Sequence, residues 1–460
     1  MTSFTLLFGN TVTGREIRCK GHQLSKARTV LNVATALSAL TVLFASTAQL
    51  APAAHAATDP FYEYTGDTPL ASIEPGTVLA TRTLDYHMAG VPLPVPVVQL
   101  LYRTTDAQDR AVANVTSVLK PPGGGDPAKA IAYQSFYDSL NPEDGPSRSI
   151  AGDVSFGGLT NAAEGPLLAA SLAQGYTVIV ADTEGQHADF AAGPEYGMNT
   201  LDSIRAATRS PDTGLGPDTR IGLTGYSGGA IATNWAAALA PGYAPDVNAR
   251  LVGAAEGGVL VNPARNLRYV SGSVGWAGVA GMAIIGVARS FDIDFTPYMS
   301  DYGHAIVDRM RYAAISNVLW QYPGLTWQQV VRPEYADPAS VPPMVDALRR
   351  IDLGLAPTPT IPMLIGQGAQ GSIEGTDNDK PGIGGGDGVM IAGDVRSLAN
   401  QYCADGTPVE YHQYDLLSHV PSAVAWLPTS LVWLNDRFAG KPAPSTCGSI
   451  APGNSLDPTP

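Results

Sequence analysis

The chain has 460 residues, of which 45% are hydrophobic, and it carries 27 Lys+Arg against 41 Asp+Glu. This length and composition describe a globular protein with a sizeable core, and they exclude a largely disordered chain. The net charge of −14 repels nucleic-acid phosphate, so nucleic acid is excluded as a partner.

The first 56 residues have the pattern of an export signal. Five Lys and Arg residues precede an uncharged stretch over 29–55, and Ala54-His55-Ala56 supplies the small-x-small pattern of a signal-peptidase site. The stretch is long enough to span a bilayer, so a membrane anchor is the alternative. Its Ser, Thr and Asn content and its alanine-rich end favour cleavage. We therefore expect residues 1–56 to be a signal peptide and the protein to be secreted, without a permanent membrane anchor.

Short β-rich runs alternate with helical patterns along most of the remaining chain, which indicates an α/β sheet with crossover helices. One run, TVIVA at 177–181, is apolar throughout, as expected for a strand buried on both faces. The predicted strands are 111–119, 130–135, 177–181, 221–224, 251–255, 360–366 and 409–414, and predicted helices include 199–208, 230–240 and 391–402.

The strand pattern disappears between Glu256 and about Pro357, where three helical patterns follow one another over 276–289, 302–319 and 341–350. Helices inserted between two strands of a sheet predict a cap or lid. The alternative is a continuation of the core with irregular connections. The expected organisation is a core over 57–258 and 356–440, a helical cap over 259–355 and a C-terminal tail over 441–460. The Gly/Ala-rich helix at 276–289 fits either a buried packing helix or the wall of an acyl-binding tunnel.

The pentapeptide Gly225-Tyr226-Ser227-Gly228-Gly229 matches the G-x-S-x-G pattern between a predicted strand and a predicted helix. Its glycines suit a tight, strained turn whose neighbours cannot carry bulky side chains. The helix that follows directs its N-terminal amides at the position where an oxyanion forms. The pattern therefore predicts an α/β-hydrolase nucleophile at Ser227.

In this fold the acid and the base follow the serine in the order Ser, Asp/Glu, His. His419, in the loop after the predicted strand 409–414, is the expected general base, because a serine hydroxyl needs an imidazole to accept its proton. The other histidines that we considered lie in a strand, in the cap or before the serine: His412, His304, His87 and His187.

The expected acid follows the predicted strand 360–366. We favour Asp387 within Gly384-Gly385-Gly386-Asp387-Gly388, just before a predicted helix, and expect it to orient the imidazole and stabilise the imidazolium. Asp379 and Asp377 are the next candidates, and the same region also contains Glu374 and Asp394.

Cys403 and Cys447 are the two cysteines that remain after the signal peptide, so a disulfide between them is expected in an oxidising compartment. Two free thiols are the alternative. The loop that begins at Asp377 has an EF-hand-like start but carries a proline at its fifth position and Gly388 at its twelfth, which does not match a calcium site. We therefore predict neither a metal nor another cofactor.

Taken together, several motifs resemble the secreted lipase family of α/β hydrolases typified by Candida antarctica lipase A, which has many actinobacterial members. The resemblance runs from Asp59 to about Phe438. It is carried by Gln99-Leu100-Leu101-Tyr102-Arg103-Thr104-Thr105, Tyr133-Gln134 with Asp138-Ser139, Asp182-Thr183-Glu184-Gly185, Leu201-Asp202-Ser203-Ile204-Arg205-Ala206-Ala207, the pentapeptide around Ser227, and Ser418-His419-Val420.

This resemblance implies Ser227, Asp387 and His419 as a catalytic triad, with the amides of Asp138 and Gly228 as oxyanion donors. It also implies a helical cap and a lipid or small ester as the substrate. The expected function is a secreted serine hydrolase that cleaves carboxylic esters, as a triacylglycerol lipase does, through an acyl-serine intermediate. A short-chain carboxylesterase, an acyltransferase on the same machinery and an inactive binding protein are the alternatives.

Overall fold

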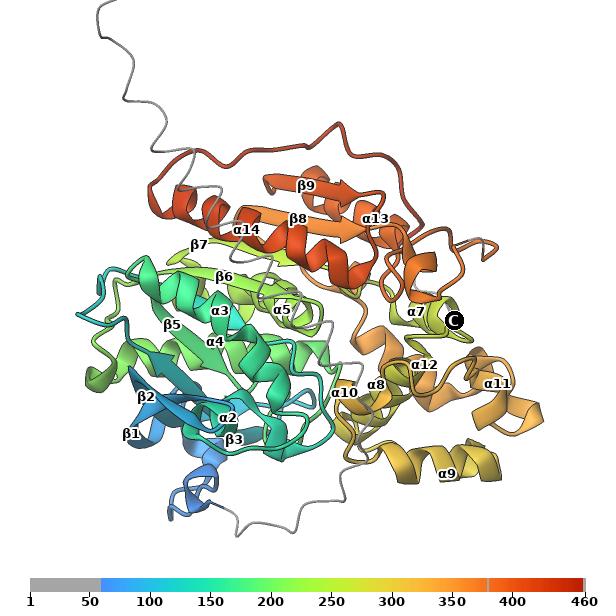
Figure 1. The fold of residues 1–460 in the computed structure, drawn as a ribbon, viewed down its shortest axis with the longest axis horizontal. Coiled ribbons are helices and arrows are strands. Elements are labelled where there is room, and N and C mark those ends of the chain that lie inside the picture. Colours follow the sequence, from blue (N-terminus) through green and yellow to red (C-terminus); the bar gives the residue numbers. More distant parts are fainter. Residues whose placement is uncertain (1–58, 379, 458–460) are drawn as a thin grey trace, which may run out of the picture. The chain divides into compact units, whose positions relative to one another are not determined.

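The computed structural model describes residues 59–378 and 380–457 (Figure 1). The predicted signal peptide, residues 1–56, lies outside the described residues. Within them, no helix is both long and apolar enough to cross a bilayer.

The described part of the chain forms a nine-stranded sheet in the order β1-β2-β3-β5-β4-β6-β7-β8-β9. Antiparallel pairing joins β1 to β2, β2 to β3 and β3 to β5, and parallel pairing joins all the later neighbours. The strands are β1 (Val78–Met88), β2 (Val91–Thr105), β3 (Ala111–Leu119), β4 (Lys129–Gln134), β5 (Thr177–Ala181), β6 (Arg220–Tyr226), β7 (Leu251–Gly257), β8 (Met363–Gly368) and β9 (Val409–Tyr414).

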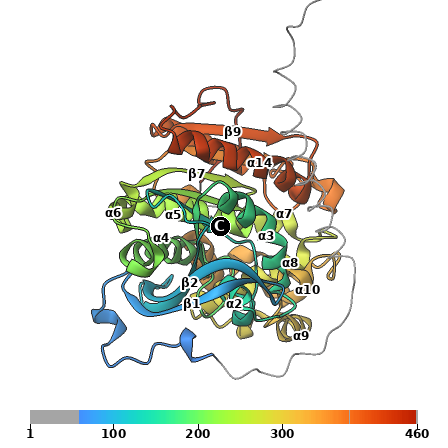
Figure 2. The same cartoon turned by 60° about the vertical axis from the view of Figure 1, so that its left-hand side comes forward.

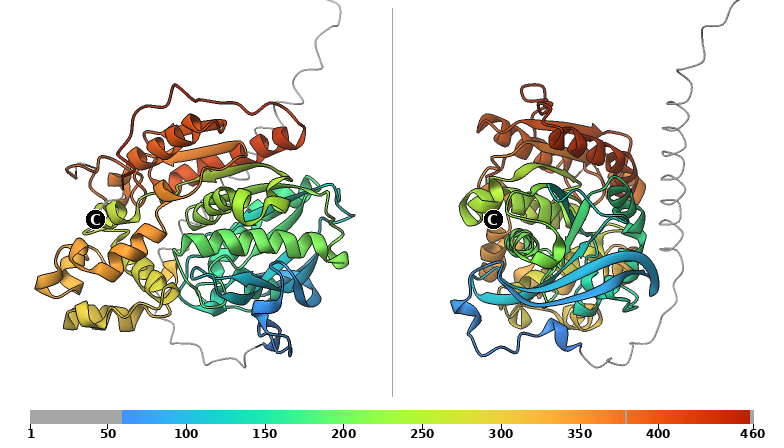
Figure 3. Two further views of the ribbon diagram at one scale, coloured as in Figure 1. Left: turned by 180° about the vertical axis from the view of Figure 1, so that it is seen from behind. Right: turned by 90° about the vertical axis from the view of Figure 1, so that its left-hand side faces the viewer.

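Helices cover both faces of the sheet (Figures 2 and 3). On β4, Ala130 and Ala132 belong to the core cluster beneath α4, α5 and α13, whereas Ile131 belongs to the cluster beneath α2, α3 and α14. Successive strand residues therefore enter two different cores, which explains why the inner strands such as β4 and β5 are mostly apolar on both faces. These helices are α2 (Pro146–Ala151), α3 (Leu159–Ala173), α4 (Gly193–Arg209), α5 (Gly228–Tyr243), α13 (Ala392–Ala404) and α14 (His419–Phe438).

Between β7 and β8 the chain forms a group of helices at one side of the sheet (Figure 1). We call residues 259–355 the helical insertion. Part of it has a small hydrophobic core of its own, which includes Phe295, Trp327 and Met344. Its helices are α7 (Pro263–Val270), α8 (Ala277–Ser290), α9 (Asp301–Met310), α10 (Ile315–Val318), α11 (Trp327–Val330) and α12 (Pro342–Arg350).

The helix predicted over 302–319 is interrupted in the structure, because α9 ends at Met310 and α10 begins at Ile315. Between them the chain bonds to a loop of the core. Leu140 donates its amide to the carbonyl of Ala313, and Ile315 donates its amide to the carbonyl of Asp138. These main-chain bonds between segments compete with continued helix, and they attach the insertion to the loop after β4.

Strands β1 and β2 have no counterpart among the predicted strands. Three prolines in β2, Pro92, Pro94 and Pro96, obscure its pattern, since proline cannot donate to a ladder. The structure accommodates them because this section of β2 pairs with β1 only, and the pairing with β3 begins at Val97. Alternate residues direct their amide nitrogens to the same edge of a strand, so the three missing donors of Pro92, Pro94 and Pro96 all lie on one edge of β2.

The C-terminal tail runs back over the core. Cys447 forms a disulfide with Cys403 at the end of α13, and the amide of Thr446 donates to the carbonyl of Val409 in β9. Further on, the Asn454 side chain donates to Asp394 over 2.6 Å. The tail is therefore fastened to two elements of the core.

Removing this disulfide should destabilise the protein. The two cysteines are 44 residues apart. Closing a loop of that length lowers the entropy of the unfolded chain and raises the free energy of unfolding by about 4 kcal/mol. We expect Cys447→Ser to lower the midpoint of thermal unfolding by several degrees. Cys403→Ser and the double variant are the controls, because all three lose the same bond and should show the same decrease. An unchanged midpoint in oxidised protein would contradict this prediction.

Candidate active site

Ser227 lies on a sharp turn between β6 and α5. Its backbone has φ 56° and ψ −119°, which is an unfavourable conformation for a residue with a side chain. A Cβ on Gly225 would collide with the carbonyl of Gly229, and one on Gly229 would collide with the carbonyl of Gln134. The glycines therefore allow α5 to approach β4 closely, and this approach holds the serine on its turn.

Three side chains predicted from the sequence lie in one line of hydrogen bonds. Ser227 Oγ is 2.8 Å from His419 Nε2, and His419 Nδ1 is 2.7 Å from Asp387 Oδ2. The residues follow β6, β9 and β8, so the carboxyl ends of three parallel strands bring them together, with β7 lying between β6 and β8 in the sheet. His419 is the first residue of α14, where the sequence predicted a loop.

Asp387 is fully buried, and its carboxylate accepts four hydrogen bonds. Besides His419, Gln367 donates to Oδ2 over 3.0 Å, and the amides of Val389 and Met390 donate to Oδ1 over 3.0 and 2.7 Å. Its backbone carbonyl also accepts the amide of His419, over 2.7 Å. These bonds hold the carboxylate against the imidazole's Nδ1 and leave it little freedom to turn away.

The charge on His419 is governed by opposing effects. Burial lowers the pKa of the imidazole, but the carboxylate of Asp387, with smaller effects from Glu374 and Asp138, raises it above its ordinary value. The site therefore favours the imidazolium, which is the form that results when the imidazole accepts a proton.

Asp138 and Gly228, the predicted oxyanion donors, are neighbours in the structure. The Asp138 carboxyl packs so closely on Gly228 that a Cβ there would collide with it. Asp138 has a left-handed backbone, with φ 38°. Burial raises the pKa of its carboxyl to about 8, although His419 lowers it, so the group is mostly neutral at pH 7. A neutral carboxyl does not oppose an anion that forms beside it.

Buried groups hold the loop that contains Asp138. The Glu164 carboxylate accepts the Phe136 amide over 2.8 Å and the Ser135 hydroxyl over 2.7 Å. The Ser139 amide donates to Glu184 over 3.2 Å. Burial raises the pKa of Glu164 to about 7 and that of Glu184 well above its ordinary range. Two buried carboxyls therefore set the path of this loop.

Arg289, in the last turn of α8, joins the helical insertion to the same loop. Its Nη1 donates to the carbonyls of Leu140, His187 and Ala188 over 3.0, 2.6 and 3.0 Å. Its Nη2 donates to the carbonyl of Arg311 over 2.9 Å. One guanidinium thus bonds to four carbonyls from three segments of the chain, a contact that no sequence motif indicates.

The alternative bases have other partners or positions. His412 Nε2 is 2.8 Å from Glu410, and His87 Nδ1 is 3.3 Å from the carbonyl of Ile150. His304 lies on α9, and His187 lies in the loop that Arg289 contacts.

Among the alternative acids, Asp394 pairs with Arg265 over 2.6 Å, and Asp379 lies outside the described residues. Asp377 lies in the same loop as Asp379. The imidazole nitrogen Nδ1 bonds to Asp387 instead. Glu374 does lie beside His419, bound to the amide of Val420 over 3.0 Å. In the described part of the chain, no group of three or more His, Cys, Asp or Glu side chains is placed to hold a metal ion.

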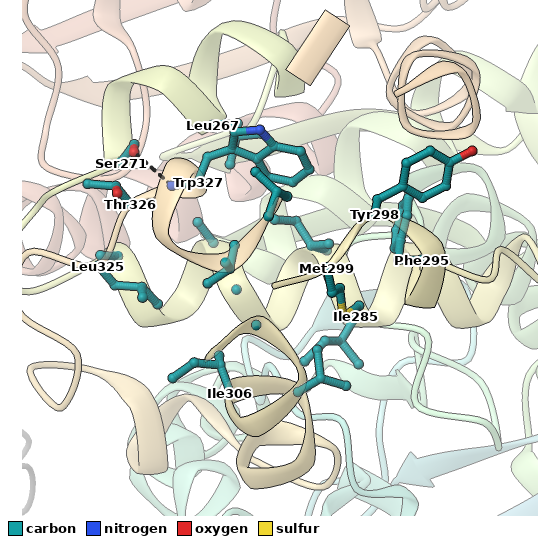
Figure 4. Close-up of a pocket in the computed structure, with 18 residues that line it drawn as sticks. Leu267, Ser271, Ile285, Phe295, Tyr298, Met299, Ile306, Leu325, Thr326 and Trp327 are labelled. Carbon is teal, nitrogen blue, oxygen red and sulfur yellow. Dashed lines mark hydrogen bonds between the residues drawn. The ribbon is translucent and has the colours of Figure 1, made fainter. Parts of the chain in front are cut away.

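Two apolar cavities border α8. One, of about 70 Å³, lies inside the helical insertion, and the side chains of Leu267, Ile306 and Trp327 line it (Figure 4). The other, of about 90 Å³, is lined by Ile231 of α5 and by Met390, which bonds to Asp387. Leu267, Ala280 and Ile284 line both cavities. Apolar space therefore extends from the neighbourhood of the triad into the insertion.

Comparison with known proteins agrees with this geometry. The family model described as secretory lipase matches residues 152–380 and 383–446. A probable inactive lipase of Mycobacterium tuberculosis is 31% identical over 393 residues, 84% of this chain and 82% of that protein. The secreted triacylglycerol lipase LIP7 of Malassezia globosa is 30% identical over 390 residues, 82% of this chain and 78% of that protein.

Among solved structures, Candida antarctica lipase A in its closed state is similar with a TM-score of 0.74 and 26% identity, covering 88% of this chain and 91% of that one. The rice cell wall degrading esterase LipA from Xanthomonas oryzae, at 15% identity and a TM-score of 0.60, shares the fold over 80% of this chain and 100% of its own. The fold and the relatives define an ester-hydrolysing enzyme of the α/β-hydrolase type. The chain belongs to the secretory lipase family.

A buried carboxyl beneath the site makes stability depend on pH. Glu256 in β7 is fully buried and accepts the Asn234 side chain over 2.7 Å, and burial raises its pKa to about 8. Its unfolded pKa is about 4.3, so between these values the folded state binds more protons than the unfolded state. The contribution of Glu256 to stability must therefore fall as the pH rises from about 5 to 8.

We expect Glu256→Gln, which resembles the protonated acid, to flatten this dependence. The midpoint of thermal unfolding, measured between pH 5 and 8, should fall by several degrees less in the variant than in the wild type. Glu334→Gln, at an exposed position, is the control and should keep the wild-type slope. Equal slopes in all three proteins would contradict the expected role of Glu256.

Proposed function

We propose that the protein is a secreted serine hydrolase that cleaves carboxylic esters, with acylglycerols as its substrates, through an acyl-serine intermediate. The observation that carries this proposal is the line of hydrogen bonds from Ser227 through His419 to Asp387. The Mycobacterium tuberculosis relative is named inactive, but this chain has all three groups within hydrogen-bond distance, which supports an active enzyme.

In the proposed mechanism His419 Nε2 takes the proton of Ser227 as Oγ attacks the carbonyl carbon of the ester. The imidazolium then donates that proton to the leaving alkoxide, and an alcohol departs. Water, activated by the same imidazole, attacks the acyl-serine and releases the carboxylic acid and the free hydroxyl. Asp387 keeps the proton of Nδ1 in place and stabilises the imidazolium in both halves of the reaction.

The negative charge that develops on the carbonyl oxygen needs fixed donors. We propose the amides of Gly228 and Asp138 for this role. Gly228 is the first residue of α5, so its amide belongs to the positive end of a helix dipole. The Asp138 side chain packs closely on Gly228, which supports a second donor close to the first.

Acylglycerol substrates are supported by the apolar cavities along α8. Hydrocarbon chains gain free energy when they leave water for such a lining. We propose that the helical insertion acts as a cap whose helix α8 forms the wall of the acyl site. The named substrate of the Malassezia relative, triacylglycerol, agrees with this assignment, and the family description agrees with export from the cell.

Two substitutions test the proposed triad. Ser227→Ala should abolish hydrolysis of an emulsified triacylglycerol, with a loss of about 10⁴-fold or more in kcat, because no nucleophile remains. Asp387→Asn should lower kcat by about 10⁴-fold, because the amide favours the wrong imidazole tautomer. Asp377→Asn is the control and should retain activity. Circular dichroism must show that each variant is folded. Unchanged turnover in Ser227→Ala would refute the serine mechanism.

A substitution at Ala280 tests the acyl site, since this residue lines both cavities. We expect Ala280→Phe to obstruct long acyl chains, lowering kcat/KM for p-nitrophenyl palmitate by about tenfold while leaving the acetate ester nearly unaffected. Ala288→Phe, on the same helix but lining neither cavity, is the matched control. If both variants show the wild-type chain-length profile, the acyl chain binds elsewhere.

A further inference from the structure

A second buried carboxylate, Glu374, lies beside the proposed triad and has no part in the mechanism above. It ends the short helix η9 (Gly371–Glu374), and only 6% of its surface is exposed. Both carboxylate oxygens are used: Oε1 accepts the amide of Val420 over 3.0 Å, and Oε2 accepts the indole N–H of Trp276 over 2.7 Å. A buried carboxylate that is fully hydrogen-bonded is fixed in position.

The two donors place Glu374 against the imidazole of His419. Val420 is the residue that follows His419 at the start of α14. Trp276, which precedes α8, lies edge-on to the imidazole, with ring centroids 5.1 Å apart and planes inclined by 79°. Glu374 therefore binds one neighbour of the histidine in sequence and another in space.

The charged and titratable groups that face His419 come from several elements. Asp387 bonds to Nδ1, and Asp138 lies across the site on the loop after β4. Tyr226, from β6, donates its hydroxyl to the His419 carbonyl over 2.7 Å and places its ring 5.1 Å from the imidazole. Burial of the Asp138 and Tyr226 side chains raises the pKa of both groups, which keeps them mostly neutral at pH 7.

We propose that Glu374 is a positioning residue that holds the start of α14 and supplies the second negative charge, after Asp387, that stabilises the His419 imidazolium. This inference rests on the proposed function of His419 as the general base. Its physical basis is Coulombic, since a fixed carboxylate in a buried site acts on a developing positive charge with little screening by water.

The titration of both partners agrees with this geometry. Burial and the nearby Asp387 carboxylate raise the pKa of Glu374 above its ordinary value, although the positive charge of His419 and the hydrogen bond from Val420 act to lower it. In the same way, Glu374 is among the groups that raise the pKa of His419, after Asp387. Each group thus favours the charged form of the other.

Glu374→Gln tests the inference, because it keeps the shape and removes the charge. Without that charge the imidazolium is less stable, so the pKa of His419 falls and the base stays deprotonated to lower pH. We expect the acid limb of the pH profile of kcat/KM to move down by about one pH unit. The plateau should fall by about tenfold, because the imidazolium formed in the transition state loses the same stabilisation.

Two further variants complete the experiment. Glu256→Gln, a buried carboxyl to amide change on a neighbouring strand, should leave the acid limb in place. Glu374→Asp keeps the charge but moves it away from His419, because the side chain is one methylene shorter, so the acid limb should move in the same direction by a smaller amount. This variant provides the test if Glu374→Gln does not fold. A lower plateau with an unmoved acid limb would mean that Glu374 only supports the fold, and it would overturn the inference.

Failure of the proposed function has a different signature. If Ser227→Ala and His419→Ala retain ester hydrolysis, the general-base assignment itself is wrong. If both are inactive while Glu374→Gln leaves the acid limb at its wild-type position, the triad stands and only the role of Glu374 is refuted.

Discussion

The close approach of α5 to β4 is the constraint on which the site depends. It requires glycine at positions 225 and 229, where any side chain would meet a backbone carbonyl. It also forces Ser227 into a strained conformation that the surrounding sheet and helix must maintain. Because the same approach brings the start of α5 to the loop after β4, it determines the position of the serine and of both proposed oxyanion donors.

Buried acids form most of the polar framework around this turn. Asp387 bonds to the imidazole, Glu374 binds the residue after it, and Glu164 and Glu184 hold the loop of Asp138. Carboxylates suit this task because each can accept several backbone amides, which would otherwise remain unpaired in a dry interior. Burial also keeps some of them neutral near pH 7, so a site rich in acids can still accommodate an oxyanion.

Much of this arrangement could be predicted from the sequence, because it follows local rules. The strands 111–119, 177–181 and 409–414 have the predicted bounds, since continuous or alternating apolar runs limited by turn residues specify them directly. The order Ser, Asp, His indicated the region of the chain in which to look for the acid, and that region contains several acidic residues. The structure then placed Asp387, from among five candidates, against the imidazole.

Contacts between distant segments could not be predicted in this way. The prolines of β2 concealed a long strand. A strand tolerates them there only because β3 does not pair with that section of β2, and the sequence does not show this. The break between α9 and α10 depends on main-chain bonds to a loop far away in the sequence, such as that from Ile315 to Asp138. The bonds of Glu374 and Arg289 likewise join segments that no local pattern relates.

The hydrogen bonds of Arg289 restrict how α8 can move. Since one guanidinium holds four carbonyls, releasing this end of the helix would leave all four without a donor at once. Any rearrangement that spares these bonds must turn about the C-terminal end of α8. The helix is 14 residues long, which is about 20 Å, so a tilt of about 10° would displace its opposite end by about 4 Å. That end carries Trp276, and such a swing would withdraw the indole from the imidazole while the pivot stayed still.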